Sequence, residues 1–141
     1  MEHHNYGFTI KTPLSDEAAI GAVTEALKAE GFGVLTEIDV QAVLKKKLDV
    51  EVAPYKILGA CNPSLSHRVL AAEPEVGLLL PCNVTVYRDE AGHTTVSAID
   101  ALAMFSVIQR PDLEPVAREV SARLRRALET LPTLEQAGEP A

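Results

Sequence analysis

The chain has 141 residues, of which 47% are apolar, and a formal net charge of −7 at neutral pH. This is the length of one domain, which buries roughly two thirds of its unfolded surface without needing cross-links. The two cysteines are too few for a disulfide framework, and the acidic charge argues against nucleic acid as a partner. Residues 1–5 are polar and no apolar run is long enough to span a bilayer, so we expect a cytoplasmic protein without a membrane partner.

The first third of the chain predicts a strand–helix–strand unit. Tyr6, Phe8 and Ile10 alternate with polar residues, which is typical of a strand with one buried face. Ser15 is a good helix N-cap, and Gly31 is suited to the left-handed residue that ends a helix. The elements expected here are a strand over 6–12, a helix of about four turns ending near 30 and a strand over 32–38.

The remaining elements follow from the same kinds of signal. Asp39 is placed to cap a helix, and Pro63 suits the first turn of another. The expected elements are a helix over 40–48, a strand over 52–60, a helix over 63–72, a strand over 76–88, a turn over 89–92, a strand over 93–101, a short helical or irregular segment over 102–108 and a last helix from 111–115 to 131.

This alternation predicts one domain over residues 1–131, followed by a disordered tail over 132–141. We expect a two-layer α/β sandwich in which helices cover one face of a mixed sheet of about five strands. The helix over 63–72 would act as a crossover and make its two flanking strands parallel. A sheet with one uncovered face needs a second layer, so we also expect a homodimer.

The two cysteines occur in similar settings, Cys61-Asn62-Pro63 and Pro81-Cys82-Asn83. Cys61 precedes a predicted helix N-terminus, a position that favours thiolate, whereas Cys82 lies on an apolar strand face. Either cysteine is also explained as a small buried hydrophobic residue. The neighbouring asparagines fit a polar pocket lining or local turn chemistry equally well. We predict free thiols without a structural disulfide.

Several of these segments resemble the DUF302 family of small prokaryotic proteins. The resemblance is carried by Tyr6-Gly-Phe, Leu58-Gly-Ala-Cys-Asn-Pro63, Gly77-Leu-Leu-Leu-Pro-Cys-Asn-Val84 and Ser97-Ala-Ile-Asp100 with Met104. It implies the two-layer fold called TT1751-like, often found as a homodimer, and it implies no established reaction.

The segments around the cysteines are the predicted functional site. The leading hypothesis is a small-ligand-binding protein; the alternatives are a thiol-dependent redox or sulfur-transfer protein, with Cys61 as the catalytic candidate, and a purely structural interaction module. The predicted ligand-binding residues are Cys61, Asn62, Pro63, His67, Pro81, Cys82 and Asn83.

No cofactor or metal site is indicated. Two cysteines and His67 lack the spacing of a zinc site. Lysines 45–47 fall in the last turn of a predicted helix, where they complement the helix dipole, and the arginines of the last helix lie mostly off its apolar stripe.

Overall fold

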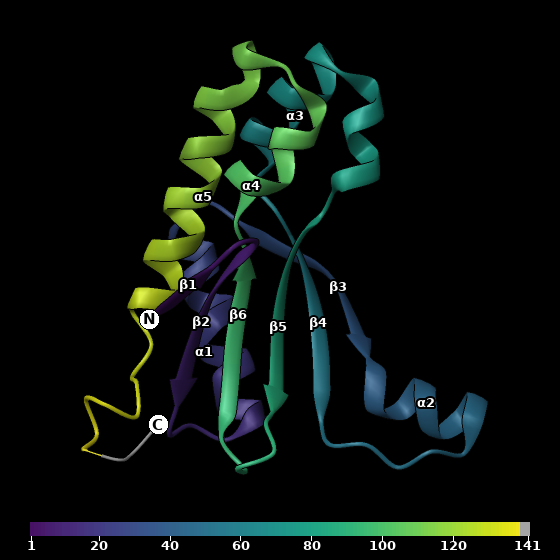
Figure 1. Cartoon of the computed structure of the whole chain (residues 1–141), viewed down its shortest axis with the longest axis vertical. Helices are drawn as coiled ribbons and strands as arrows, with labels where there is room; N and C mark the ends of the chain where they lie inside the picture. Colours follow the sequence, from purple (N-terminus) through teal and green to yellow (C-terminus); the bar gives the residue numbers. More distant parts are fainter. Residues whose placement is uncertain (139–141) are drawn as a thin grey trace.

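The computed structural model describes residues 1–138 and contains a six-stranded antiparallel sheet (Figure 1). The strand order is β1-β2-β6-β5-β4-β3. The strands are β1 (Glu2–His4), β2 (Gly7–Thr12), β3 (Gly33–Asp39), β4 (Tyr55–Cys61), β5 (Cys82–Arg88) and β6 (Thr94–Ile99). The α-helices are α1 (Asp16–Ala29), α2 (Val40–Leu48), α3 (Pro63–Ala72), α4 (Ala101–Phe105) and α5 (Glu114–Glu129). Three short 3₁₀ helices complete the list: η1 (Pro74–Leu79), η2 (Ser106–Ile108) and η3 (Pro111–Leu113).

Helices begin at the capping residues that the sequence predicts. The Ser15 hydroxyl accepts a hydrogen bond from the Ala18 amide at the start of α1, and the Asp39 carboxylate accepts one from Ala42 at the start of α2. These side chains satisfy backbone N–H groups that have no partner within the helix. Gly31, with φ of 87°, follows α1 in the left-handed conformation that glycine adopts without strain.

Helices α1 and α5 cover one face of the sheet; in Figure 1, α1 lies behind the strands. Aliphatic side chains fill the space between the layers, and the fully buried ones include Leu58, Val84, Val96 and Leu124. Among residues 1–138, no helix covers the other face over β2, β6 and β5. The predicted class, a two-layer α/β sandwich with helices on one face, is confirmed.

The sheet differs from the expectation in strand number and direction. It has six strands instead of about five, and β4 and β5 are antiparallel neighbours, so the sheet is not mixed. Residues 76–79, predicted as the start of a strand, belong to the 3₁₀ helix η1 (Pro74–Leu79). Pro74 begins this turn and Pro81 cannot donate to a strand ladder, so β5 begins only at Cys82.

Both ends of the chain pack against the sheet. Strand β1 was not predicted, because three polar residues carry no hydrophobic alternation. The tail prediction does not hold at Leu134, which is 2% exposed and whose N–H donates to the Lys11 carbonyl. Residues 139–141 of the predicted disordered tail lie outside the described residues.

The helices α3 and α4, together with the first half of α5, extend beyond one end of the sheet (Figure 1). At the opposite end α2 projects from the edge strand β3 and has no buried residue. Within residues 1–138, no helix is long and apolar enough to cross a membrane.

Candidate functional site

The two cysteine segments meet at one end of the sheet. Cys61 is the last residue of β4 and Cys82 the first of β5, and Ala60 lies opposite Cys82 in the antiparallel ladder. The expected parallel arrangement is therefore wrong. Two antiparallel neighbours place the end of one strand beside the beginning of the next, so these segments are closer than a crossover would have made them.

Asn62 is a structural residue in this arrangement. Its side chain is 5% exposed, its Oδ1 accepts from the Leu65 amide at the start of α3, and its Nδ2 donates to the Glu30 carbonyl at the end of α1. Gly31 leaves the space for this amide, because a Cβ there would lie 2.9 Å from Nδ2. The amide joins two helix ends, and its hydrogen-bonding groups are used within the fold.

The two thiols have different surroundings. Cys82 is 5% exposed, and burial, with a smaller contribution from Cys61, raises the pKa of its thiol to about 12. Cys61 is half-buried and its Sγ lies 3.4 Å from the Ser66 Oγ. The cavity beside Cys82 is only about 10 Å³, which is space for one water molecule and not for a ligand.

The other predicted site residues do not join a common pocket. Pro63 and His67 are exposed on α3. Pro81 packs against Gly59 of β4, where an added Cβ would come within 2.8 Å of the proline ring. Asn83 is exposed on the uncovered face of the sheet, away from the helices. Within residues 1–138, no group of three or more His, Cys, Asp or Glu residues is arranged to hold a metal ion.

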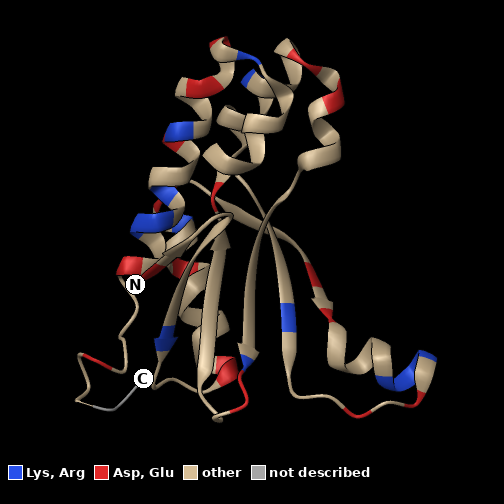
Figure 2. Ribbon diagram, viewed as in Figure 1, with Lys and Arg blue, Asp and Glu red and all other residues tan. Residues whose placement is uncertain are grey.

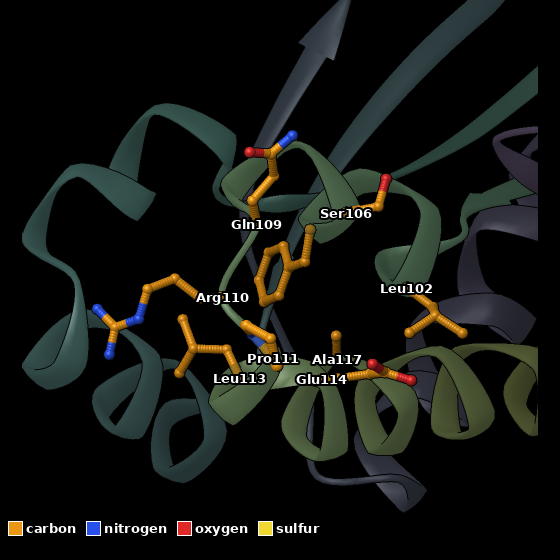
Figure 3. Close-up of a pocket in the computed structure, with 9 residues that line it drawn as sticks. Leu102, Ser106, Gln109, Arg110, Pro111, Leu113, Glu114 and Ala117 are labelled. Carbon is orange, nitrogen blue, oxygen red and sulfur yellow. The ribbon is translucent and has the colours of Figure 1, made fainter.

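A larger cavity lies in the helical end of the molecule (Figure 3). It measures about 440 Å³ and is bounded by α4 and η2 on one side and by η3 and the first turn of α5 on the other. Its lining residues are Leu102, Phe105, Ser106, Gln109, Arg110, Pro111, Leu113, Glu114 and Ala117. We call this space the α4–α5 cavity.

Local hydrogen bonds fix the walls of the α4–α5 cavity. Asp100 caps α4 by accepting from the amides of Leu102 and Ala103, and the Ser121 hydroxyl of α5 donates to the same carboxylate at 2.8 Å. Gln109 ends η2 in the left-handed conformation, with φ of 57°. These bonds join the start of α4 to α5, the two helices that flank the cavity.

The charges at the mouth of the cavity are paired with neighbours. The Arg110 guanidinium contacts the carboxylates of Asp112 at 2.6 Å and Glu73 at 3.5 Å, and the Asp112 partner raises the pKa of Arg110. Glu114 pairs with Arg118 at 2.6 Å. Gln109 is exposed, and within residues 1–138 no hydrogen bond to its side-chain amide is found, while its backbone N–H donates to the Ser106 carbonyl.

Most of the polar side chains that line the cavity are engaged in contacts within the fold. The Ser106 hydroxyl already donates to the Ala103 carbonyl at 2.6 Å, and the carboxylate among the lining residues, Glu114, pairs with Arg118. The sequence did not indicate this site, since residues 102–108 carry no motif. The one available signal was their apolar content in a segment without regular periodicity.

Comparison with known proteins agrees with the fold. The family model described as a domain of unknown function, DUF302, matches residues 8–131. The chain belongs to the DUF302 family. A crystal structure of an uncharacterized conserved DUF302 protein from Bacillus stearothermophilus is similar, with a TM-score of 0.82 and 31% sequence identity over 87% of this chain and 95% of that one. No curated protein matches the sequence.

The basic residues of this DUF302 protein largely complement nearby acids (Figure 2). Lys45 contacts Asp49 and Glu51, at 2.6 and 2.7 Å. On α5, the arginines pair with acidic side chains one turn away or with Glu30. The interpretation of these runs as solvated helix faces fits this pairing, and family membership adds no reaction to it.

Proposed function

We propose that this DUF302 protein binds a small, uncharged and largely apolar molecule in the α4–α5 cavity. The observation that carries the proposal is the cavity itself, which measures about 440 Å³ and has a largely apolar wall that includes Leu102, Phe105, Leu113 and Ala117, and of its polar lining residues Ser106, Arg110 and Glu114 are engaged within the fold. Ligand sites of proteins commonly have this size and this mixture of apolar walls and few polar groups.

The polar groups at the mouth narrow the class of ligand. Arg110 is engaged by two carboxylates, so it offers no free charge to an anionic ligand. The exposed amide of Gln109 both donates and accepts hydrogen bonds. These features favour a ligand with an apolar body and one carbonyl or hydroxyl group that meets Gln109.

The test uses the native full-length protein and the neutral apolar dye Nile red. We expect saturable fluorescence enhancement that falls when Ser106→Trp fills the cavity. Gln109→Gly removes the side-chain amide at a position where the left-handed backbone is one that glycine adopts without strain. Gln109→Asn keeps a side-chain amide there. Mass spectrometry of molecules extracted from the purified native protein then identifies any bound compound. Dye binding that Ser106→Trp leaves unchanged would place the dye elsewhere and contradict the proposal.

The ligand site originally predicted around the cysteines receives less support, because the adjoining cavity is too small. The thiol alternative rests on Cys61, whose Sγ is half-buried beside Ser66 at the start of α3. Cys82 argues against a paired-thiol mechanism, since a pKa of about 12 keeps its thiol protonated at neutral pH. Fast alkylation of Cys61 in the native protein at neutral pH would favour the thiol alternative.

We also propose that the protein is a homodimer. Five exposed large apolar side chains lie within one short stretch at the β3 edge and around α2, a surface that we call the α2 edge: Leu35, Ile38, Val43, Leu48 and Val50. A two-fold contact between two copies would remove this surface from water. Sedimentation should show a dimer that Leu48→Glu dissociates.

Two free cysteines are consistent with a cytoplasmic location, which we retain as a proposal.

A further inference from the structure

A second candidate site lies on the uncovered face of the sheet and differs from the apolar cavity in its chemistry. It is a groove of about 300 Å³ that crosses β2, β6, β5 and β4. Its lining residues are His4, Tyr6, Gly7, Thr9, Tyr55, Asn83, Thr85, Tyr87, Ser97, Ala98 and Ile99. The chain has three tyrosines, and all three are in this set. We call it the sheet groove.

The floor of the sheet groove is an ordered row of hydroxyl groups. The His4 Nε2 lies 3.2 Å from the Thr9 Oγ1, which in turn lies 2.8 Å from the Ser97 Oγ. This chain of hydrogen bonds runs across three neighbouring strands and holds the three side chains in place. Groups fixed in this way bind a ligand without the entropy cost of ordering them.

Glycine at position 7 allows the imidazole to lie at one end of the groove. A Cβ there would lie 3.0 Å from the His4 Cε1 and 2.8 Å from the Ala98 carbonyl oxygen. The contact with the carbonyl oxygen is closer than a Cβ tolerates and the contact with the ring is tight, so a larger residue would force the backbone or the ring to shift. His4 is thus held over the backbone of β2, with its Nε2 toward Thr9.

Aromatic rings stand at both ends of the sheet groove. Tyr55 and Tyr87 stack with their centroids 5.0 Å apart and an interplanar angle of 16°. At the other end, Tyr6 packs edge-on against His4 at 4.6 Å, and Tyr6 is 68% exposed. Tyrosine offers an apolar ring face together with a hydroxyl group at one tip.

No lining residue of the sheet groove carries a formal charge apart from the titratable His4. Figure 2 shows that β6 and β5 lack charged residues over most of their length. The nearby Lys11 is paired with Asp89 at 3.3 Å. Burial raises the pKa of Tyr87, so its phenol stays neutral and can donate. The groove offers no free cation to a phosphate or carboxylate.

The groove also has hydrogen-bonding capacity that the fold does not use. Within residues 1–138, no side-chain hydrogen bond is found for Asn83, Thr85 or Tyr55. Beneath this face, opposite Tyr87 in the ladder, Thr95 is 1% exposed and its Oγ1 has no partner among residues 1–138, although Thr95 is not itself a lining residue of the groove. Buried polar groups without partners are rare in folded proteins and call for an explanation.

We propose that the sheet groove binds a neutral saccharide, as a single ring or a short oligosaccharide. Sugar hydroxyls donate and accept at once, as do the hydroxyl and amide groups of Ser97, Thr85 and Asn83. The apolar C–H faces of a sugar ring pack on the exposed faces of the tyrosines. A neutral lining matches a ligand without charge.

The test exploits the tyrosines, because the chain has no tryptophan. Intrinsic fluorescence of the native protein therefore reports on the sheet groove alone. The probes are methyl glycosides of glucose, galactose, mannose and N-acetylglucosamine, with glucose 6-phosphate as the charged comparison. We expect a saturable change in tyrosine fluorescence with at least one neutral glycoside. The affinity for that glycoside should fall by up to about tenfold in Asn83→Ala and in Ser97→Ala, as expected for the loss of one hydrogen bond.

Matched controls separate this inference from the proposed apolar site. Gln109→Gly, in the α4–α5 cavity, should leave glycoside binding unchanged, and Asn83→Ala should leave Nile red binding unchanged. Three results would overturn the inference: no saturable response to any neutral glycoside, a stronger response to glucose 6-phosphate, or binding retained in Asn83→Ala. It would also be wrong if the protein were a dimer that Asn83→Arg dissociates, since the groove would then be a contact between copies.

Discussion

The two faces of the sheet are built from the same strands and have opposite character. Along β5, Cys82, Val84 and Val86 are buried beneath the helices, while Asn83 and Thr85 alternate with them on the uncovered face. The period of two in a strand produces both faces from one sequence. The covered face contributes most of the apolar burial, and the uncovered face carries hydroxyl groups whose removal costs the fold little.

The largest effect that we expect from this comparison is a change in the free energy of unfolding at two neighbouring residues of β4. Leu58 is fully buried beneath the helices, and Ile57 is half-buried on the uncovered face. We expect Leu58→Ala to lower the free energy of unfolding by about 2–5 kcal/mol, because it leaves a cavity in the core. Ile57→Ala should lose clearly less. Denaturant unfolding measures both, and equal losses would show that the uncovered face is packed against another layer.

The alternation that separates these faces was largely readable from the sequence. The alternation at residues 6–10 predicted a strand, and strand β2 buries Phe8 and Ile10, while Tyr6 lies just before it and is exposed. The predicted caps Ser15 and Asp39 are also found in the structure. The turn at 74–79 was not readable, because a short apolar run has the same composition in a strand and in a helix. Strand direction was wrong for another reason: the helix over 63–72 was expected to act as a crossover, whereas β4 and β5 are antiparallel neighbours.

The candidate sites were less accessible to sequence reasoning than the fold. Cysteines attract attention because their chemistry is distinctive, but Cys82 proved to be buried beside a very small cavity. The α4–α5 cavity is formed by segments whose apolar residues are unremarkable one by one. Its existence depends on how α4 and α5 pack, which no local pattern specifies.

The second prediction compares the two Cys-Asn pairs. Asn62 is buried and joins the ends of α1 and α3, whereas Asn83 is exposed. Asn62→Ala should lower the free energy of unfolding by about 1–2 kcal/mol through the loss of a helix cap. Asn83→Ala should change it by less than about 0.5 kcal/mol.

A further variant divides the role of Asn62. Asn62→Asp keeps an oxygen acceptor for the start of α3 and removes the donor to the Glu30 carbonyl, so we expect an intermediate loss. Thermal or denaturant unfolding of the three variants gives the order. A loss for Asn83→Ala equal to that for Asn62→Ala would contradict the assignment of structural and exposed roles.

The third prediction concerns pH at the junction of the sheet and its helical end. Burial acts to raise the pKa of Asp100, but hydrogen bonds from Ser121, His3 and the α4 amides outweigh it and hold the pKa below its ordinary value. The carboxylate therefore stabilises the fold above the unfolded-state pKa of about 3.9, and this contribution is lost as the pH falls through the folded-state pKa.

Replacing the carboxylate removes that pH dependence. Asp100→Asn should be less stable than the parent at neutral pH by about 1 kcal/mol, the typical value of a helix cap. The difference between the two proteins should shrink as the pH falls below about 3.9. Unfolding free energies measured across this range test it; a difference that grows toward acid would mean that Asp100 is protonated in the fold.

The smallest expected effect is on the two thiols at the junction of β4 and β5. Both are free, and Cys82 lies opposite Ala60 and not opposite Cys61 in the ladder. We predict that a reducing agent leaves the melting temperature unchanged. Loss of a cross-link would remove about 2–4 kcal/mol and lower the melting temperature by several degrees.

Scanning calorimetry of the parent and of Cys61→Ser, each with and without reductant, decides between these outcomes. A drop seen only in the parent would show that Cys61 and Cys82 are paired, and the thiol-dependent alternative would then replace the view that Cys82 is a core residue.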